Sequence, residues 1–286
     1  VFHGTAAVAF GRGADRLGGA LLVLGSACFG GAIALIGQLY HLSGDAFDAM
    51  LVWFAMAAVS AAAFRSGALT AMTGILAFAA FSALLEQFNF DWHGVYGWWP
   101  VLSALVIVFL SIWTGMERAR HFAYLLILAW FLWLYSLSSD TQTALAFAVA
   151  GVLAFLAATL PVSPVAGLLR RHEPSLAFYA LVLGFVGLAL LHGDWTDGMP
   201  LALLGFATIA LSLVALALEG RDNGAVRFLS YAAFAAEVLY LSYVTIDSML
   251  GTSTFFLLAG LVVAVLAGVV VKLEKLFARR AGEVKP

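Results

Sequence analysis

Residues 199–218, MPLALLGFATIALSLVALAL, form a run of twenty positions without a charged side chain. As an α-helix, a run of this length spans about 30 Å, which is the thickness of the hydrocarbon core of a bilayer. The apolar residues are continuous rather than alternating, and this pattern predicts a helix in lipid instead of a strand of a membrane barrel. The stretch therefore predicts that the chain crosses a membrane as an α-helix.

The composition extends this prediction to the whole chain. Hydrophobic residues make up 64% of the 286 positions and charged residues 10%, whereas soluble domains carry about 45–50% and about 25%. We expect an all-α, polytopic transmembrane helical bundle in which residues 1–286 form a single integral membrane domain. Its ten predicted spans are 17–40, 46–64, 67–88, 98–115, 120–138, 141–160, 175–192, 199–218, 227–247 and 252–271.

The basic residues predict the orientation of these spans. All 14 lysines and arginines fall before the first span, after the last, or in or directly beside every second connection. Because cytoplasmic loops carry an excess of Lys and Arg, this alternation predicts that both ends of the chain are cytoplasmic. Residues 1–10, VFHGTAAVAF, are apolar but too short to span. We expect them to be the tail of an earlier transmembrane helix.

Glu237 is the most informative single residue, because it falls near the middle of the span 227–247. A charged side chain at the centre of a membrane helix costs about 2.5–3.5 kcal/mol on insertion scales, so we expect Glu237 to face a polar interior. Ser230 and Tyr240 share its helix face and could form hydrogen bonds with it. Two interpretations follow: a proton or cation site, or a protonated glutamate that joins two helices through a hydrogen bond.

The side opposite the basic residues carries a second group of candidates. These residues end spans or lie in short connections, and we predict that they form one outer vestibule: Gln38, Tyr40, His41, Asp45, Glu86, Asp91, His93, His192 and Asp194. Histidine and aspartate could together bind a metal ion, but their spacing is looser than a recognised ligand signature, so the metal content stays open. An aromatic belt with acidic loop residues explains the same pattern.

The run 31–53, GAIALIGQLYHLSGDAFDAMLVW, resembles DUF2157, a family of uncharacterised bacterial multi-pass membrane proteins. The family shows a helix that ends in a GQ-x-Y-x-x-SGD-like stretch, followed by a helix with an early tryptophan. The resemblance implies a multi-pass protein of the bacterial inner membrane, and it draws attention to Gln38, Tyr40 and Asp45. It implies no activity.

Three classes of function remain open. The first is a transporter or channel-like protein for a small polar solute or ion, favoured by Glu237. The alternative is a non-transporting scaffold, assembly factor or accessory subunit of an envelope complex. A membrane enzyme ranks last, because the chain lacks recognised catalytic, nucleotide-binding and haem motifs. We expect no cofactor and no nucleic acid as a partner; the expected partners are the lipid bilayer and other membrane subunits.

Overall fold

The computed structural model describes residues 1–39, 46–86, 95–160, 166–167 and 175–247, with isolated residues between 257 and 272. Each regular element in these ranges is a helix, so the all-α prediction is confirmed for them. Nine of the described helical segments are long and apolar enough to cross a bilayer. They match the first nine predicted spans. The tenth, 252–271, falls mostly outside the described residues.

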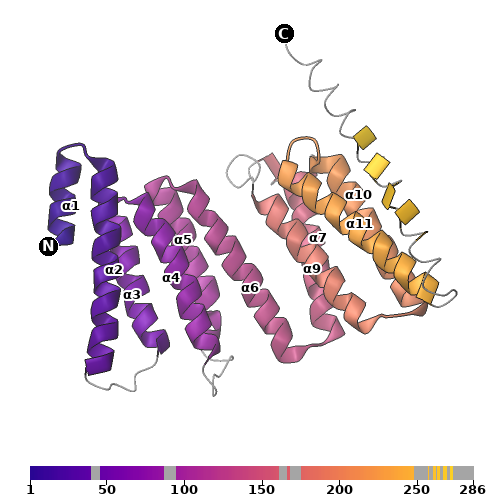
Figure 1. Cartoon of the computed structure of the whole chain (residues 1–286), viewed down its shortest axis with the longest axis horizontal. Helices are drawn as coiled ribbons and strands as arrows, with labels where there is room; N and C mark the ends of the chain where they lie inside the picture. The colour runs from indigo at the N-terminus through magenta and orange to yellow at the C-terminus, as the bar shows by residue number, and fades with distance from the viewer. Residues whose placement is uncertain are drawn as a thin grey trace, which may run out of the picture. The chain divides into compact units, whose positions relative to one another are not determined.

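The chain divides into two compact units, Val1–Leu134 and Tyr135–Pro286. The helices of each unit run up and down side by side (Figure 1). Unit 1 contains α1 (Phe2–Gly11), α2 (Asp15–Leu39), α3 (Ala46–Phe64), α4 (Gly67–Leu85), η1 (Val95–Trp98), α5 (Trp99–Thr114), η2 (Glu117–Ala119) and the start of α6 (Arg120–Ser138). Unit 2 contains the end of α6, then α7 (Thr141–Thr159), α9 (Leu176–Asp194), α10 (Gly198–Glu219) and α11 (Gly224–Asp247).

Unit 1 is held together by aromatic side chains that pack into faces of small residues. The indole Nε1 of Trp53, on α3, donates a hydrogen bond to the hydroxyl of Ser26, on α2, over 3.1 Å. The ring lies against Gly30, where an added Cβ would come within 2.4 Å of it. Small residues four positions apart on α2 therefore make room for an aromatic side chain of α3.

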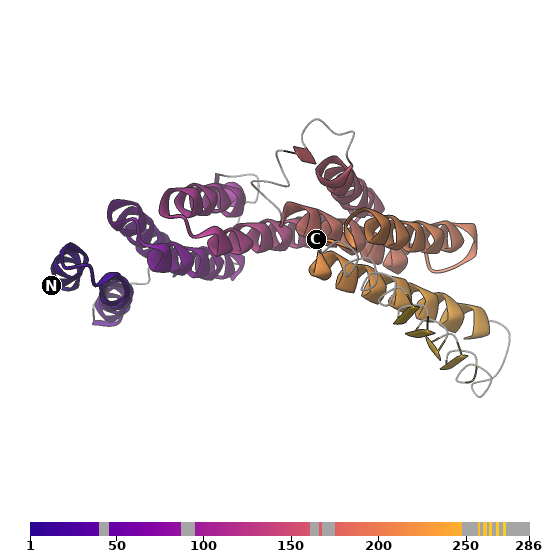
Figure 2. The same cartoon turned by 90° about the horizontal axis from the view of Figure 1, so that it is seen from above.

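Unit 2 is organised around a closer contact, between the backbones of α7 and α9. A Cβ added to Gly151 would lie 2.2 Å from the backbone nitrogen of Gly184, and one added to Gly187 would lie 2.2 Å from that of Ala148. These distances leave room only for hydrogen, so the glycines let the two helices meet backbone to backbone. Seen from above, α9, α10 and α11 lie side by side in this unit (Figure 2).

Capping residues at the starts and ends of helices allow the short connections between them. Asp140 caps α7 by accepting a hydrogen bond from the backbone N–H of Thr143 at 2.6 Å. Hydrogen bonds from the side chain and backbone of Thr143 hold the pKa of this carboxyl below its usual value. Gly115 ends α5 in the left-handed conformation, with φ of 71°, which glycine adopts without strain. The connection between α5 and α6 therefore turns sharply.

Candidate functional site

The candidate site lies in unit 2, where the last turn of α9 faces the middle of α11. α9 continues through His192 and ends at Asp194, so His192 is a helical residue rather than part of a loop. Gly187 of α9 packs closely against α7, and this contact sets the position of the last turns of α9. Glu237 is thirteen residues from the start of α11 and only 5% exposed.

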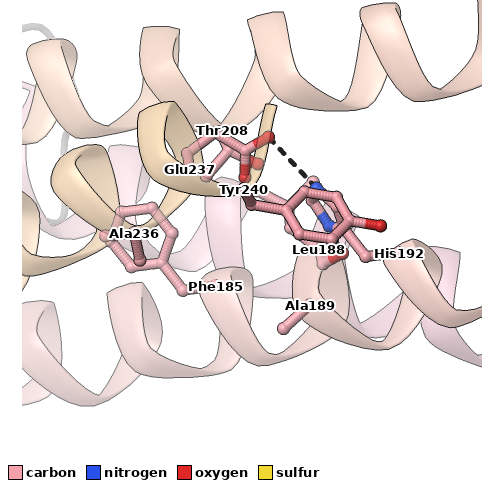
Figure 3. A pocket seen from close by; sticks show the side chains of 9 residues that line it. Phe185, Leu188, Ala189, His192, Thr208, Ala236, Glu237 and Tyr240 are labelled. Atoms are coloured by element: carbon pink, nitrogen blue, oxygen red, sulfur yellow. Dashed lines mark hydrogen bonds and ion pairs between the residues drawn. The ribbon is translucent and has the colours of Figure 1, made fainter. Parts of the chain in front are cut away.

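His192 and Glu237 form a direct pair. The imidazole Nε2 lies 3.1 Å from the carboxylate Oε1, and both side chains are largely buried, at 15% and 6% exposure. Figure 3 shows the two groups facing each other, with the Tyr240 ring beside them. That ring stands edge-on to the imidazole, with centroids 5.1 Å apart and an angle of 79°. The histidine is therefore fixed by contacts on two sides.

The second nitrogen of the imidazole determines where the proton of the pair can be. His192 Nδ1 lies 2.8 Å from the carbonyl oxygen of Leu188, which can only accept a hydrogen bond. Nδ1 therefore carries a proton and donates it. Two neutral arrangements remain for Nε2 and Oε1: a protonated Glu237 donates to a neutral imidazole, or an imidazolium donates to a carboxylate. In both arrangements one proton is shared between the two residues.

A cavity of about 320 Å³ adjoins this pair. Its walls come from α9, α10 and α11, and its lining residues are Phe185, Leu188, Ala189, His192, Thr208, Ala233, Ala236, Glu237 and Tyr240. In Figure 3, Phe185 and Ala236 are drawn away from the dashed line that joins His192 and Glu237. The cavity thus has one polar end, formed by the histidine, glutamate and tyrosine, and apart from Thr208 the rest of its lining is apolar.

α10 forms the base of the site and brings a glycine close to the carboxylate. A Cβ on Gly205 would lie 2.9 Å from Glu237 Oε1 and 2.7 Å from Leu241 Cδ1. The hydroxyl of Thr208 donates to the carbonyl of Leu204 at 3.0 Å and keeps lone pairs free to accept. The absence of a side chain at Gly205 therefore lets α10 pack against Glu237 without displacing it.

The three residues predicted for the intramembrane polar site lie on one face of α11. Tyr240 lines the cavity with Glu237, whereas Ser230 does not. Ser230 is fully buried, and its hydroxyl has no hydrogen-bond partner among the described residues. Glu237 thus pairs with His192 of another helix and not with Ser230 of its own helix.

The residues predicted for the outer vestibule lie in different parts of the structure. His192 belongs to the Glu237 site, while the exposed Asp194 accepts a hydrogen bond from the Thr141 hydroxyl at 2.7 Å. Gln38 and Glu86 are exposed at the ends of α2 and α4 in unit 1. Five others lie outside the described residues: Tyr40, His41, Asp45, Asp91 and His93. Among the described residues, no three His, Cys, Asp or Glu side chains gather as metal ligands would.

The sequence pattern predicts His192 and Glu237 in separate sites and does not predict their pairing. It also missed Thr208 and the apolar lining. One signal was available for α9: His192 shares a helix face with Phe185, Leu188 and Ala189, at spacings of seven, four and three. That face marks a histidine directed at a neighbouring helix, but it does not say which helix.

The comparisons with known proteins concern the N-terminal part of the chain. No curated protein and no solved structure matches the chain. The family model DUF2157, described as a predicted membrane protein, matches residues 1–70, which cover α1 to the start of α4. The resemblance found in the run 31–53 is therefore confirmed, and over its first 70 residues this membrane protein matches the DUF2157 family.

Proposed function

We propose that this chain is a multi-pass transporter of the bacterial inner membrane that couples the passage of a small polar solute or ion to a proton. One observation carries the proposal: the buried Glu237 carboxyl lies 3.1 Å from His192 Nε2 at the polar end of a cavity. Ionisable groups inside a membrane typically mark ion or proton pathways. The cavity gives a solute or proton access to the pair.

The proton shared by the pair suggests how coupling would operate. Loss of that proton leaves one negative charge on the pair, and gain of a second leaves one positive charge. Either charge is costly in an apolar surrounding, so the pair favours a solute or proton that restores neutrality. The apolar lining from Phe185 to Ala236 favours a solute that carries its polar group on an apolar body.

The transport assay uses the full chain in liposomes that contain a pH-sensitive dye. We expect a proton gradient to drive uptake of at least one member of a panel of small amines, carboxylates and amino acids. Glu237→Gln keeps the shape and hydrogen bonds of the side chain but cannot ionise, so flux should fall to that of protein-free liposomes. Glu117→Gln is the matched control, because Glu117 is exposed in a connection of unit 1.

A wild-type protein that moves neither protons nor any solute of the panel would contradict the transporter proposal. So would a Glu237→Gln variant with wild-type flux. The alternative, a non-transporting scaffold or accessory subunit, would then be favoured. Its support is the apolar part of the same cavity, which could receive an apolar side chain from a helix of another membrane subunit.

We further propose that both ends of the chain are cytoplasmic, from the one-sided distribution of basic residues. In a Cys28→Ser background, we expect Asp197→Cys to react with an impermeant thiol reagent added from the periplasmic side. Arg118→Cys should react only after the membrane is permeabilised. Both positions are exposed at connections between helices. External labelling at position 118 would reverse the orientation.

A further inference from the structure

A second cavity lies at one end of unit 1 and shares no residue with the His192–Glu237 site. It has a volume of about 510 Å³ and is found where α1 and α3 end and α2 and α4 begin. The lining residues are Phe10, Asp15, Arg16, Gly19, Ala20, Phe64, Arg65, Ser66, Gly67 and Ala68. Two arginines and one aspartate supply its charges, so the fixed side chains leave it one positive charge in excess.

Arg65 lines this cavity, and Trp113 of α5 holds its side chain. Its guanidinium carbon lies 4.7 Å from the centroid of the Trp113 ring, and Nη2 donates to the Trp113 carbonyl at 3.4 Å. The indole of Trp113 is itself fixed by a 3.0 Å hydrogen bond to the carbonyl of Ala62. Arg65 also has a φ of 48°, a left-handed conformation that side chains rarely adopt. The fold therefore maintains this arginine in a conformation that costs free energy.

Arg16 supplies the second guanidinium, from the first turn of α2. It is exposed, and no acceptor among the described residues forms a hydrogen bond or ion pair with it. Five donors of a planar guanidinium suit the oxygens of a phosphate group. Arg16 and Arg65 both line the cavity, so both side chains are available to a phosphate group bound in it.

The starts of α2 and α4 add to the positive potential of the cavity. Ser66 caps α4 and accepts the N–H of Leu69 at 3.4 Å. The N–H groups of Gly67 and Ala68 belong to the first turn and have no intrahelical acceptor. The helices α2 and α4 both begin at this cavity, so both direct the positive ends of their dipoles toward it. The two helix starts add to the positive potential that the arginines supply, but without the arginines they would not define a binding site.

Apolar side chains follow the cavity along both helices. Ala20 lines it, and Leu24, one turn further on the same face of α2, is 49% exposed. Ala68 lines it as well, and Ile75, two turns further on the same face of α4, is 58% exposed. A ligand with a phosphate group and an acyl chain would place the chain against these residues, whereas a free phosphate would use none of them.

We propose that this cavity binds the phosphate headgroup of an anionic membrane lipid, with Arg16 and Arg65 as its principal contacts. Basic pockets between transmembrane helices on the cytoplasmic side suit such headgroups. The site lies among the basic residues that predict the cytoplasmic face, where the leaflet is anionic. The proposal does not depend on transport by the His192–Glu237 site.

The experiment measures thermal unfolding of the purified full chain in detergent as short-chain lipids are titrated. We expect phosphatidylglycerol to raise the midpoint temperature, and phosphatidylcholine to have little effect. Arg16→Gln should weaken the apparent affinity for phosphatidylglycerol about fivefold, because each basic residue near anionic lipid contributes on the order of 1 kcal/mol. Arg16→Gln with Arg65→Gln should remove the response. Arg65→Lys keeps the charge and should retain part of it.

Controls separate this site from general charge and from free phosphate. Arg221→Gln removes an exposed arginine of unit 2 and should leave the response unchanged. Inorganic phosphate and glycerol phosphate, at the same concentrations, should give little stabilisation because they lack acyl chains. An equal response to these anions, an equal response to phosphatidylcholine, or an unchanged affinity in Arg16→Gln would each overturn the proposal.

Discussion

Gly151→Ala should destabilise unit 2 by about 3 kcal/mol, because overpacking by even one methyl group costs about 1–3 kcal/mol where neighbours can adjust. Here the neighbour is backbone. The new Cβ would lie 2.2 Å from the nitrogen and 2.6 Å from the Cα of Gly184, so α7 and α9 must move apart. That movement would carry His192 away from Glu237. Thermal unfolding in detergent and the proton flux assay should both show the loss.

The control for this prediction is Gly184→Ala on the facing helix. Its Cβ would meet its nearest atom, the nitrogen of Val152, at 3.5 Å, which is an ordinary contact. Alanine also stabilises a helix interior relative to glycine by about 0.5–1 kcal/mol. Gly184→Ala should therefore match or exceed wild-type stability. Equal stability of the two variants would show that α7 and α9 are not in backbone contact.

Glu237→Leu should lower stability by about 2 kcal/mol, whereas Glu237→Gln should unfold at the wild-type temperature. Leucine leaves His192 Nε2 without its partner, and an unsatisfied buried polar atom costs about 1–3 kcal/mol. Glutamine can still form a hydrogen bond with the imidazole. Both variants should lose proton flux, because neither can ionise. Thermal unfolding and flux, measured on the same preparations, separate the structural from the chemical role.

A double variant tests whether the stability loss comes from the pair itself. His192→Leu with Glu237→Leu removes both polar groups, and replacement of a buried pair by apolar residues is often neutral or stabilising. We therefore expect the double variant to be more stable than Glu237→Leu alone. Additive losses from the two single substitutions would instead show that His192 and Glu237 do not interact. Wild-type flux in Glu237→Gln would make the glutamate structural.

Much of the fold could be predicted from the sequence because a membrane span is a local property. The runs 199–218 and 67–85 are apolar over the thickness of a bilayer whatever their neighbours are, and helices form there in the structure. In the structure, glycines such as Gly30 and Gly151 lie where helices approach closely. Their partners could not be predicted, because many spans offer similar small faces.

The site depends on contacts between distant parts of the chain. The sequence identified Glu237 as a costly intramembrane residue and Tyr240 as its neighbour on one helix face. It assigned His192 to the outer loops, 45 positions away from Glu237. The structure joins them because Gly187 lets α9 pack closely against α7, while Gly205 lets α10 pack closely against α11. By itself, the sequence determined the spans and their polar residues, since these follow from local transfer free energies. Only the tertiary structure decided which polar residues meet, since that follows from helix packing.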